Sequence, residues 1–131
     1  MNIDKIKGYH CPVEAAMDVI GGKYKAQIVY ELMQGTKRYS EIQKALPQAT
    51  PRMLSKQLKE LEEDGVINRV LYPVVPPKTE YSLTEMGQTL VPIVDALCKW
   101  GDSYFPIAGV SIPDKEKSMF SIPFRFRLLN R

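Results

Sequence analysis

The stretch TPRMLSKQLKELEEDGVINRVLYPVVPPKTEYSLTEMG, residues 50–87, decides the fold. Its first part predicts a helix, because Thr50 is a good N-cap, Pro51 suits the first helical position, and the pattern lasts to about Asp64. At about 100° per residue, leucines at i, i+4 and i+7 share one face: Leu54, Leu58 and Leu61. Basic residues with the same spacing share the opposite face: Arg52, Lys56 and Lys59. The leucines therefore fix this helix onto a core while a basic stripe points away.

The second part of the stretch predicts a β-hairpin. Two strand-like runs, Arg69–Tyr72 and Thr79–Leu83, flank an insert that contains three prolines. Since proline has no backbone N–H for a strand ladder, the insert belongs at the tip. We expect Pro76, Pro77 and Lys78 to form a stiff, projecting and positively charged tip. The prolines are also consistent with protecting an edge hairpin against aggregation.

The segments around this stretch complete a helix-turn-helix. Ser40 and Gln43 form a capping-box pattern, which predicts a short supporting helix before the basic helix. Upstream, PVEAAMDVI and KYKAQIVYELMQG predict two more helices, the first of which ends at Gly21-Gly22. Downstream, TEMGQTLVPIVDALCKWGDSYF is helical in pattern except at Pro92, which must kink or restart it. This order indicates a winged helix-turn-helix, mainly α with a small β-hairpin (α+β).

Length and composition agree with one domain. The 131 residues, 44% hydrophobic and 25% charged, allow one domain with a modest core. The N-terminus has no apolar signal-peptide core, and no run approaches the roughly 18 apolar residues of a membrane span. We therefore expect a cytoplasmic protein without a membrane partner.

Positive charge is concentrated in one window of the sequence. Between Thr36 and Lys59 there are six basic residues and one acid, Glu41, so this window has a charge of +5 while the whole chain has +3. A concentrated basic surface on a weakly charged body fits an anionic polymer. The basic helix fits the major groove of B-DNA, where its first turns meet base edges and its cations neutralise phosphates.

The candidate DNA contacts lie on three segments. Arg52 is the side chain best suited to a bidentate guanine contact, and Lys78 and Arg69 are placed to touch the backbone or minor groove. The full set is Lys37, Arg38, Ser40, Thr50, Pro51, Arg52, Met53, Ser55, Lys56, Lys59, Arg69 and Lys78. An isolated basic stripe is more often a solvated helix face. Here the preceding helix-turn-helix and the following hairpin favour DNA.

Four stretches of the sequence resemble the HxlR-type transcriptional regulators, a branch of the MarR-like winged-helix proteins. They are CPVEAAMDVIGGKYKAQIVYEL, KRYSEIQKALP, the stretch quoted first, and ALCKWG, which together span Cys11 to Gly101 in unbroken order. The resemblance implies a homodimeric bacterial regulator that binds double-stranded operator DNA. By motif position, the helix with Arg52 would read the major groove and Lys78 would belong to the wing. One departure is Tyr24, where the family usually has tryptophan.

The last predicted helix carries an apolar stripe, for which the residues alone leave two interpretations open. The stripe consists of Leu90, Val91, Val94, Leu97, Cys98 and Gly101. It either packs entirely within the chain or buries part of its surface on a second copy. The resemblance favours the second, a homodimer on an inverted-repeat operator. We expect residues 1–105 to form the DNA-binding and dimerisation domain, and residues 106–131 to form a tail or arm that is partly disordered or packed on a neighbour.

Cys11 precedes Pro12 at the start of a helix, where free N–H groups and the helix dipole favour the thiolate, the reactive form. In several regulators of the resembled family, the cysteine at this position senses oxidants or electrophiles, so the resemblance implies a sensor. An equally weighted alternative is a small cap packed against the dimer helix. Cys98 fits core or dimer packing, and a bridge between Cys11 and Cys98 of two subunits is a further alternative.

The sequence contains no evident catalytic or metal-binding constellation. A single histidine excludes paired-histidine metal motifs, and no P-loop or G-x-G-x-x-G occurs. Two cysteines are too few for a cysteine-rich zinc site. We therefore expect neither an enzyme nor a cofactor, and the small-molecule effector is unknown. The alternative class is a winged-helix module that binds a protein partner and no DNA, which predicts an apolar or acidic outward helix.

Overall fold

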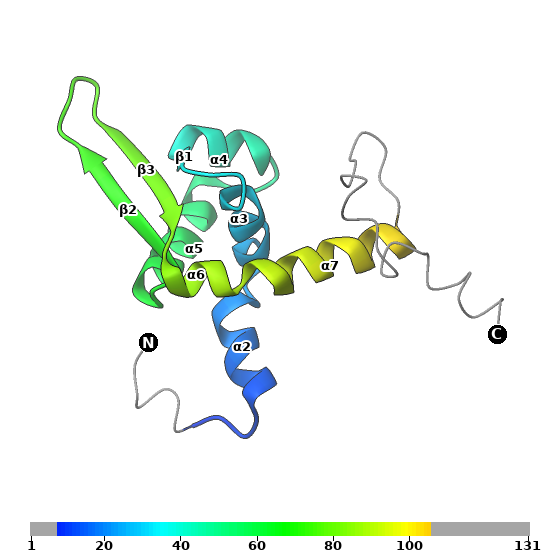
Figure 1. The fold of residues 1–131 in the computed structure, drawn as a ribbon. Coiled ribbons are helices and arrows are strands. Elements are labelled where there is room, and N and C mark those ends of the chain that lie inside the picture. The colour runs from blue at the N-terminus through cyan, green and yellow to red at the C-terminus, as the bar shows by residue number, and fades with distance from the viewer. Residues whose placement is uncertain (1–7, 106–131) are drawn as a thin grey trace, which may run out of the picture. The chain divides into compact units, whose positions relative to one another are not determined.

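The computed structural model describes residues 8–105, so the expected tail at 106–131 lies outside the described residues (Figure 1). The elements follow the order α2 (Pro12–Ile20), α3 (Lys25–Leu32), β1 (Lys37–Arg38), α4 (Tyr39–Ala45), α5 (Pro51–Glu63), β2 (Ile67–Tyr72), β3 (Lys78–Leu83), α6 (Glu85–Thr89) and α7 (Val91–Tyr104). The described residues divide into two compact units, with the boundary between Val91 and Pro92. Between residues 8 and 105, no helix is long and apolar enough to span a membrane.

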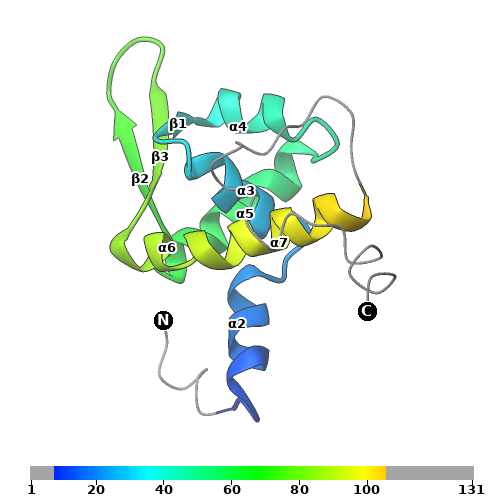
Figure 2. The same cartoon turned by 45° about the vertical axis from the view of Figure 1, so that its right-hand side comes forward.

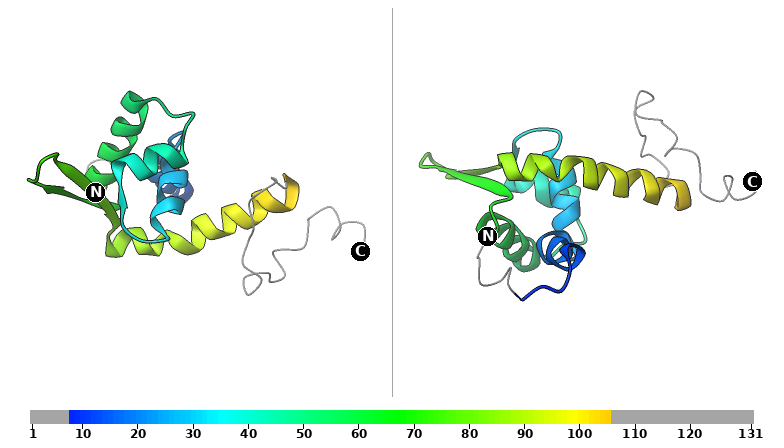
Figure 3. Two further views of the ribbon diagram at one scale, coloured as in Figure 1. Left: turned by 90° about the horizontal axis from the view of Figure 1, so that it is seen from above. Right: turned by 60° about the horizontal axis from the view of Figure 1, so that its bottom comes forward.

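The sheet has the order β1-β3-β2 and is antiparallel throughout. β2 and β3 pair from Ile67 opposite Leu83 to Tyr72 opposite Lys78. The resulting hairpin projects to one side of α3, α4 and α5 (Figures 2 and 3). The expected fold class, mainly α with a small β-hairpin arranged as a winged helix-turn-helix, is confirmed, with β1 as an additional short strand.

The core of the first unit lies between α3, α4, α5 and the start of β2. Its most deeply buried side chains are Ile28, Val29, Ile42, Leu54, Leu58, Leu61, Val66 and Ile67. Fully burying one such side chain stabilises the fold by about 1.5–3 kcal/mol relative to leaving it exposed. The three leucines of α5 are 0–2% exposed, so the apolar face predicted from their spacing is confirmed.

The ends of the helices follow local capping rules, with one correction. In α5, the Thr50 hydroxyl accepts a hydrogen bond from the Met53 N–H at 3.1 Å, and proline occupies the first helical position, as expected. The expectation that Ser40 caps α4 is wrong. The helix begins at Tyr39, and the Glu41 carboxylate accepts from the backbone N–H of Arg38 at 2.9 Å. Because β1 holds Arg38 extended opposite Glu80, the helix starts directly after Arg38 and Ser40 is its second residue.

Two helices end close to a glycine or a proline. Gly65 follows α5 with φ +77°, a left-handed conformation that glycine adopts without strain. Near Pro92 the helical pattern restarts: α6 ends at Thr89 and α7 begins at Val91. The kink or restart predicted from Pro92 is therefore confirmed as a restart.

Candidate nucleic-acid interface

The outward face of α5 is basic and exposed. Arg52, Lys56 and Lys59 are all exposed, on the side of α5 opposite its buried leucines. Of the other reader candidates on this helix, Ser55 is exposed, while Met53 is half-buried. A helix held by an apolar face while its cations point outward is a suitable shape and charge for the major groove.

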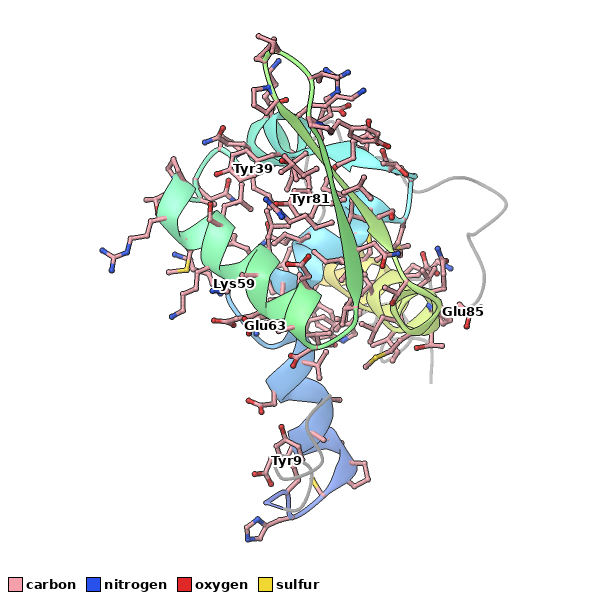
Figure 4. The ribbon with its side chains drawn as sticks, turned by 90° about the vertical axis from the view of Figure 1, so that its left-hand side faces the viewer. Tyr9, Tyr39, Lys59, Glu63, Tyr81 and Glu85 are labelled. Atoms are coloured by element: carbon pink, nitrogen blue, oxygen red, sulfur yellow. The ribbon has the colours of Figure 1, made fainter. Side chains whose placement is uncertain are left out.

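A tyrosine that the sequence reasoning did not select connects the two helices of the helix-turn-helix. The Tyr39 hydroxyl lies 3.4 Å from the Pro51 carbonyl oxygen and 3.4 Å from the Ser55 hydroxyl oxygen. It therefore fixes the start of α4 to the first turn of α5 (Figure 4). The sequence offers no signal for this role of Tyr39, because β1, which precedes it, is too short to have a periodicity of its own.

A hollow of about 370 Å³ separates α5 from the hairpin. Its lining residues are Ser55, Leu58, Lys59, Glu62, Arg69 and Tyr81. Figure 4 shows Lys59 on α5 and Tyr81 on the hairpin, on the two sides of this region. Lys59 and Arg69 place positive charge on both walls, with Glu62 as a partial counter-charge. The cations of Lys59 and Arg69, together with the Ser55 hydroxyl, can receive a phosphate group of a DNA backbone in this hollow.

Tyr81 orients the hairpin wall of this hollow. Burial raises the pKa of the Tyr81 hydroxyl above its usual 10.0, while a hydrogen bond with the Arg69 side chain and the charge of Arg69 act in the opposite direction. The hydroxyl therefore stays protonated at neutral pH. Arg69 stands opposite Tyr81 in the β2–β3 register, so their contact holds the guanidinium along the sheet.

The wing tip differs from the expected one. Lys78 is the first residue of β3, paired opposite Tyr72, so the prediction that it stands at the tip is wrong. Its ammonium nitrogen lies 3.5 Å from a Glu80 carboxylate oxygen and 4.7 Å from the centre of the Tyr72 ring. The loop beyond this pair is residues 73–77, in which Val75 is 99% exposed. The tip is therefore apolar, because the cation folds back along the strand.

A second hollow of about 560 Å³ lies between the wing loop and the β1–α4 corner. It is lined by residues 38–40 of the corner and residues 74–79 of the wing. Arg38 and Ser40 thus lie beside the wing, and both are exposed. Lys37 is half-buried in β1, opposite Tyr81, and lines neither hollow.

Cys11 occupies the N-cap position of α2, with an extended backbone and no side-chain cap hydrogen bond. Its side chain is exposed, so packing within one chain does not account for it. Next to it, the Glu14 carboxylate accepts from the His10 backbone N–H at 3.0 Å. Cys98, on α7, is half-buried. Among the described residues, no group of histidine, cysteine and acidic side chains could hold a metal ion.

The predicted dimerisation stripe, which runs from Leu90 at the end of α6 into α7, is partly buried and partly exposed. Val94 is 4% exposed, whereas Leu97 is 49% exposed. Leu90, Val91, Cys98 and Gly101 are intermediate. Two further apolar residues, Ile93 and Trp100, are 47% and 57% exposed and were not predicted. Trp100 lies 4.9 Å from Tyr104, centre to centre, so the end of α7 presents an aromatic surface.

The sequence matches known regulators over most of its length. The model of the HxlR-like helix-turn-helix family matches residues 19–108. The HTH-type transcriptional regulator YdeP of Bacillus subtilis (strain 168) is 53% identical over 94 residues, which are 72% of this chain and 73% of YdeP.

Two solved structures of regulators have similar folds. The redox regulator HypR in its oxidized form has a TM-score of 0.70 and 50% identity, covering 74% of this chain and 100% of the HypR chain. The reduced form of the transcriptional regulator YodB from B. subtilis has a TM-score of 0.62 and 33% identity, covering 75% of this chain and 97% of the YodB chain.

Proposed function

The chain belongs to the HxlR-like helix-turn-helix family of transcriptional regulators, and we propose that it acts as a homodimer on an inverted-repeat operator. The observation that carries this proposal is the exposed stripe of Arg52, Lys56 and Lys59 on a helix whose opposite face is buried. This basic face does not favour the alternative of a protein-binding module. Such a regulator would work in the cytoplasm, where a prokaryotic chromosome lies, and without catalysis.

Each part of the interface has a distinct role in this proposal. The first turns of α5 enter the major groove, where Arg52 reads a base edge and Ser55 and Lys56 lie within reach of it. The hollow beside α5 receives a backbone phosphate between Lys59 and Arg69. The wing then lies along the adjacent minor groove, which it contacts through its apolar loop.

Dimerisation is supported by the exposed apolar surface of α7. Ile93, Leu97 and Trp100 follow one another at helical spacing, and each is about half exposed in the single chain. A small protein gains stability when a second copy covers such a surface. Two reading helices about 34 Å apart would then contact half-sites separated by about one DNA turn.

Cys11 supports a thiol-dependent switch of DNA binding. It is exposed at the start of α2, and the similar structures include regulators studied in oxidized and reduced forms. We propose that reaction of this thiol with an oxidant or electrophile changes the affinity for the operator. The remaining alternative is that Cys11 packs against a second copy of the chain.

The experiment that tests the proposed function is selection of DNA from a random pool, followed by gel shifts across salt concentrations. We expect an inverted-repeat sequence to be enriched, with affinity that falls steeply as salt rises. A protein that enriches no sequence, and whose weak DNA binding is equal for all duplexes, would contradict the proposal.

A further inference from the structure

We infer that Gln57 and Glu60 are positioning residues, which set the rotation of α5 and thereby its ability to discriminate DNA sequences. Both are held by the start of α3, at its N-cap residue Tyr24 and its first residue Lys25. We call these two contacts the polar clamp. The inference rests on the proposed DNA-binding function and deepens it, because both residues are held by contacts within the chain and neither is among the candidate DNA contacts.

The first contact of the clamp joins a buried amide to the backbone. Gln57 is 6% exposed, and its Oε1 accepts a hydrogen bond from the Tyr24 backbone N–H at 3.1 Å. Its Nε2 lies 3.8 Å from the Met53 sulfur. Tyr24 is itself 3% exposed, and its hydroxyl donates to the carbonyl oxygen of Gln48, in the turn of the helix-turn-helix, at 3.3 Å. Tyr24 thus contacts both α5, through Gln57, and the turn that leads into α5, through Gln48.

The second contact is an ion pair that is largely shielded from water. The Lys25 ammonium nitrogen lies 2.6 Å from a Glu60 carboxylate oxygen, and the side chains are 7% and 34% exposed. Burying an ammonium group this deeply is unfavourable unless an anion faces it. Glu60 is therefore held at a fixed distance from the start of α3.

The spacing of the two residues explains why the clamp controls rotation. Gln57 and Glu60 are three residues apart, so they lie on the same side of α5, between its leucine face and its basic face. Leucine contacts are non-directional and tolerate small rotations of a helix, whereas hydrogen bonds do not. A rotation of α5 would move the base-reading side chain of Arg52 out of register. Phosphate contacts by long lysine side chains would tolerate the same rotation.

The absence of a side chain at Gly22 leaves room for the Gln57 amide of the clamp. A Cβ atom at this position would lie 2.6 Å from the Gln57 Oε1 and 2.9 Å from the Lys25 Cδ. Among the described glycines, only Gly35 and Gly65 have positive φ, so the backbone at Gly22 would accept alanine. Since the conformation does not require glycine there, the close approach of the buried amide accounts for it. Alanine at this position should displace the clamp without changing any residue of α5.

The test compares three variants with the wild-type protein, and the probe is a DNA duplex enriched from a random pool by the wild-type protein. Gln57→Met removes the acceptor at similar size. The pair Lys25→Met with Glu60→Leu replaces the ion pair by apolar groups, which avoids leaving one charge buried alone. Gly22→Ala displaces the clamp from the other side. The matched control is Gln27→Met, an exposed glutamine on α3 that bonds only locally, to the Lys23 carbonyl oxygen.

The readout is the ratio of affinities for the enriched duplex and a shuffled duplex of equal composition, measured well below the unfolding midpoint of each variant. We expect this ratio to fall by about 10-fold in the clamp variants, the order of one lost base contact. Affinity for the shuffled duplex should stay within about twofold, because phosphate contacts persist. Gln27→Met should leave both values unchanged.

Two results would overturn the inference. Variants that fold, bind both duplexes like the wild-type protein and differ only in thermal stability would show that the clamp is purely structural. An equal loss for both duplexes would show that it acts on general DNA binding and not on reading. A wild-type protein that enriches no sequence would instead contradict the proposed function, so the two failures are distinguishable.

Discussion

Lys78 lies over the ring of Tyr72, with its ammonium nitrogen 4.7 Å from the ring centre, and these two residues form the last β2–β3 pair before the wing loop. The same nitrogen is 3.5 Å from Glu80, so a cation–π contact and an ion pair draw the lysine back along the strand. The loop beyond them is left with apolar side chains, and Val75 is almost fully exposed. The wing would thus meet DNA by shape and apolar contact more than by charge.

The first prediction concerns which residues of the wing contact DNA. Val75→Glu should weaken binding to every DNA sequence, because it places an anion at the exposed tip beside the phosphates. Lys78→Met should change affinity by only about twofold, since the charge of Lys78 is already partnered by Glu80 and is drawn away from the tip. Gel shifts with each variant across salt concentrations measure both effects. If Lys78→Met lowered the slope of log affinity against log salt concentration by about one, the charge of Lys78 would contact a phosphate.

The second prediction separates reading from phosphate contact on α5. Arg52→Ala should weaken binding to the operator by about 1–3 kcal/mol and relax the preference at one base position. Lys59→Ala should weaken all sequences alike and lower the salt slope by about one, because it lines the hollow beside the hairpin. Selection from a random pool with each variant checks the difference. An Arg52→Ala protein with unchanged affinity and preference would show that α5 is not the reading helix.

How much of this interface was predictable depends on the range of the interactions. The buried leucines and the Thr50 cap follow from spacing and from contacts within four residues, so the sequence was enough to find α5. Lys78 was misplaced because its position depends on where strand pairing stops. That point is set by a cross-strand neighbour, Tyr72, and by Glu80, and no local pattern records it.

The remaining differences also come from tertiary contacts. β1 is only two residues long and exists because β3 offers it a partner, so it has no periodicity of its own. Ser40 is not the N-cap of α4 for the same reason, because β1 fixes where α4 can begin. The Glu41 carboxylate therefore accepts from the backbone N–H of Arg38, which is the N-cap residue. Gln57 looked like one of several polar residues of α5. Only the fold shows that it is buried against Tyr24.

The third prediction concerns pH and the hairpin wall. Because burial raises the pKa of Tyr81 in the folded protein above 10.0, the folded state keeps this proton at a pH where the unfolded chain has lost it. The stabilisation is fully present below pH 10.0 and is lost as pH rises through the folded pKa. Tyr81→Phe should therefore flatten the fall of the free energy of unfolding above pH 10.0, as urea titrations at several pH values would show. An equally steep fall in the variant would assign it to other tyrosines or to lysines.

The fourth prediction concerns α7 and assembly. Leu97→Glu places a charge on the exposed apolar surface next to Trp100, so it should shift the protein from dimer to monomer. Operator affinity should fall with it, because one half-site then binds alone. Sedimentation at micromolar concentration gives the mass, and Gln27→Glu adds the same charge to an exposed position of α3 as a control. A wild-type protein that sediments as a monomer and binds DNA as a monomer would refute the dimer.

The last prediction concerns Cys11, which is exposed at the N-cap of α2 and makes no cap hydrogen bond. Mild oxidation should lower operator affinity by about 10-fold in the wild-type protein, the scale of a typical coupling between two sites. The change should reverse with a thiol reductant and be absent in Cys11→Ser. Cys98→Ser decides between two routes: if it also abolishes the response, a bridge between the two cysteines carries the switch, which a non-reducing gel would show as a covalent dimer. If it retains the response, Cys11 acts alone. Should mass spectrometry find Cys11 fully modified while DNA binding stays unchanged, the thiol is not a sensor.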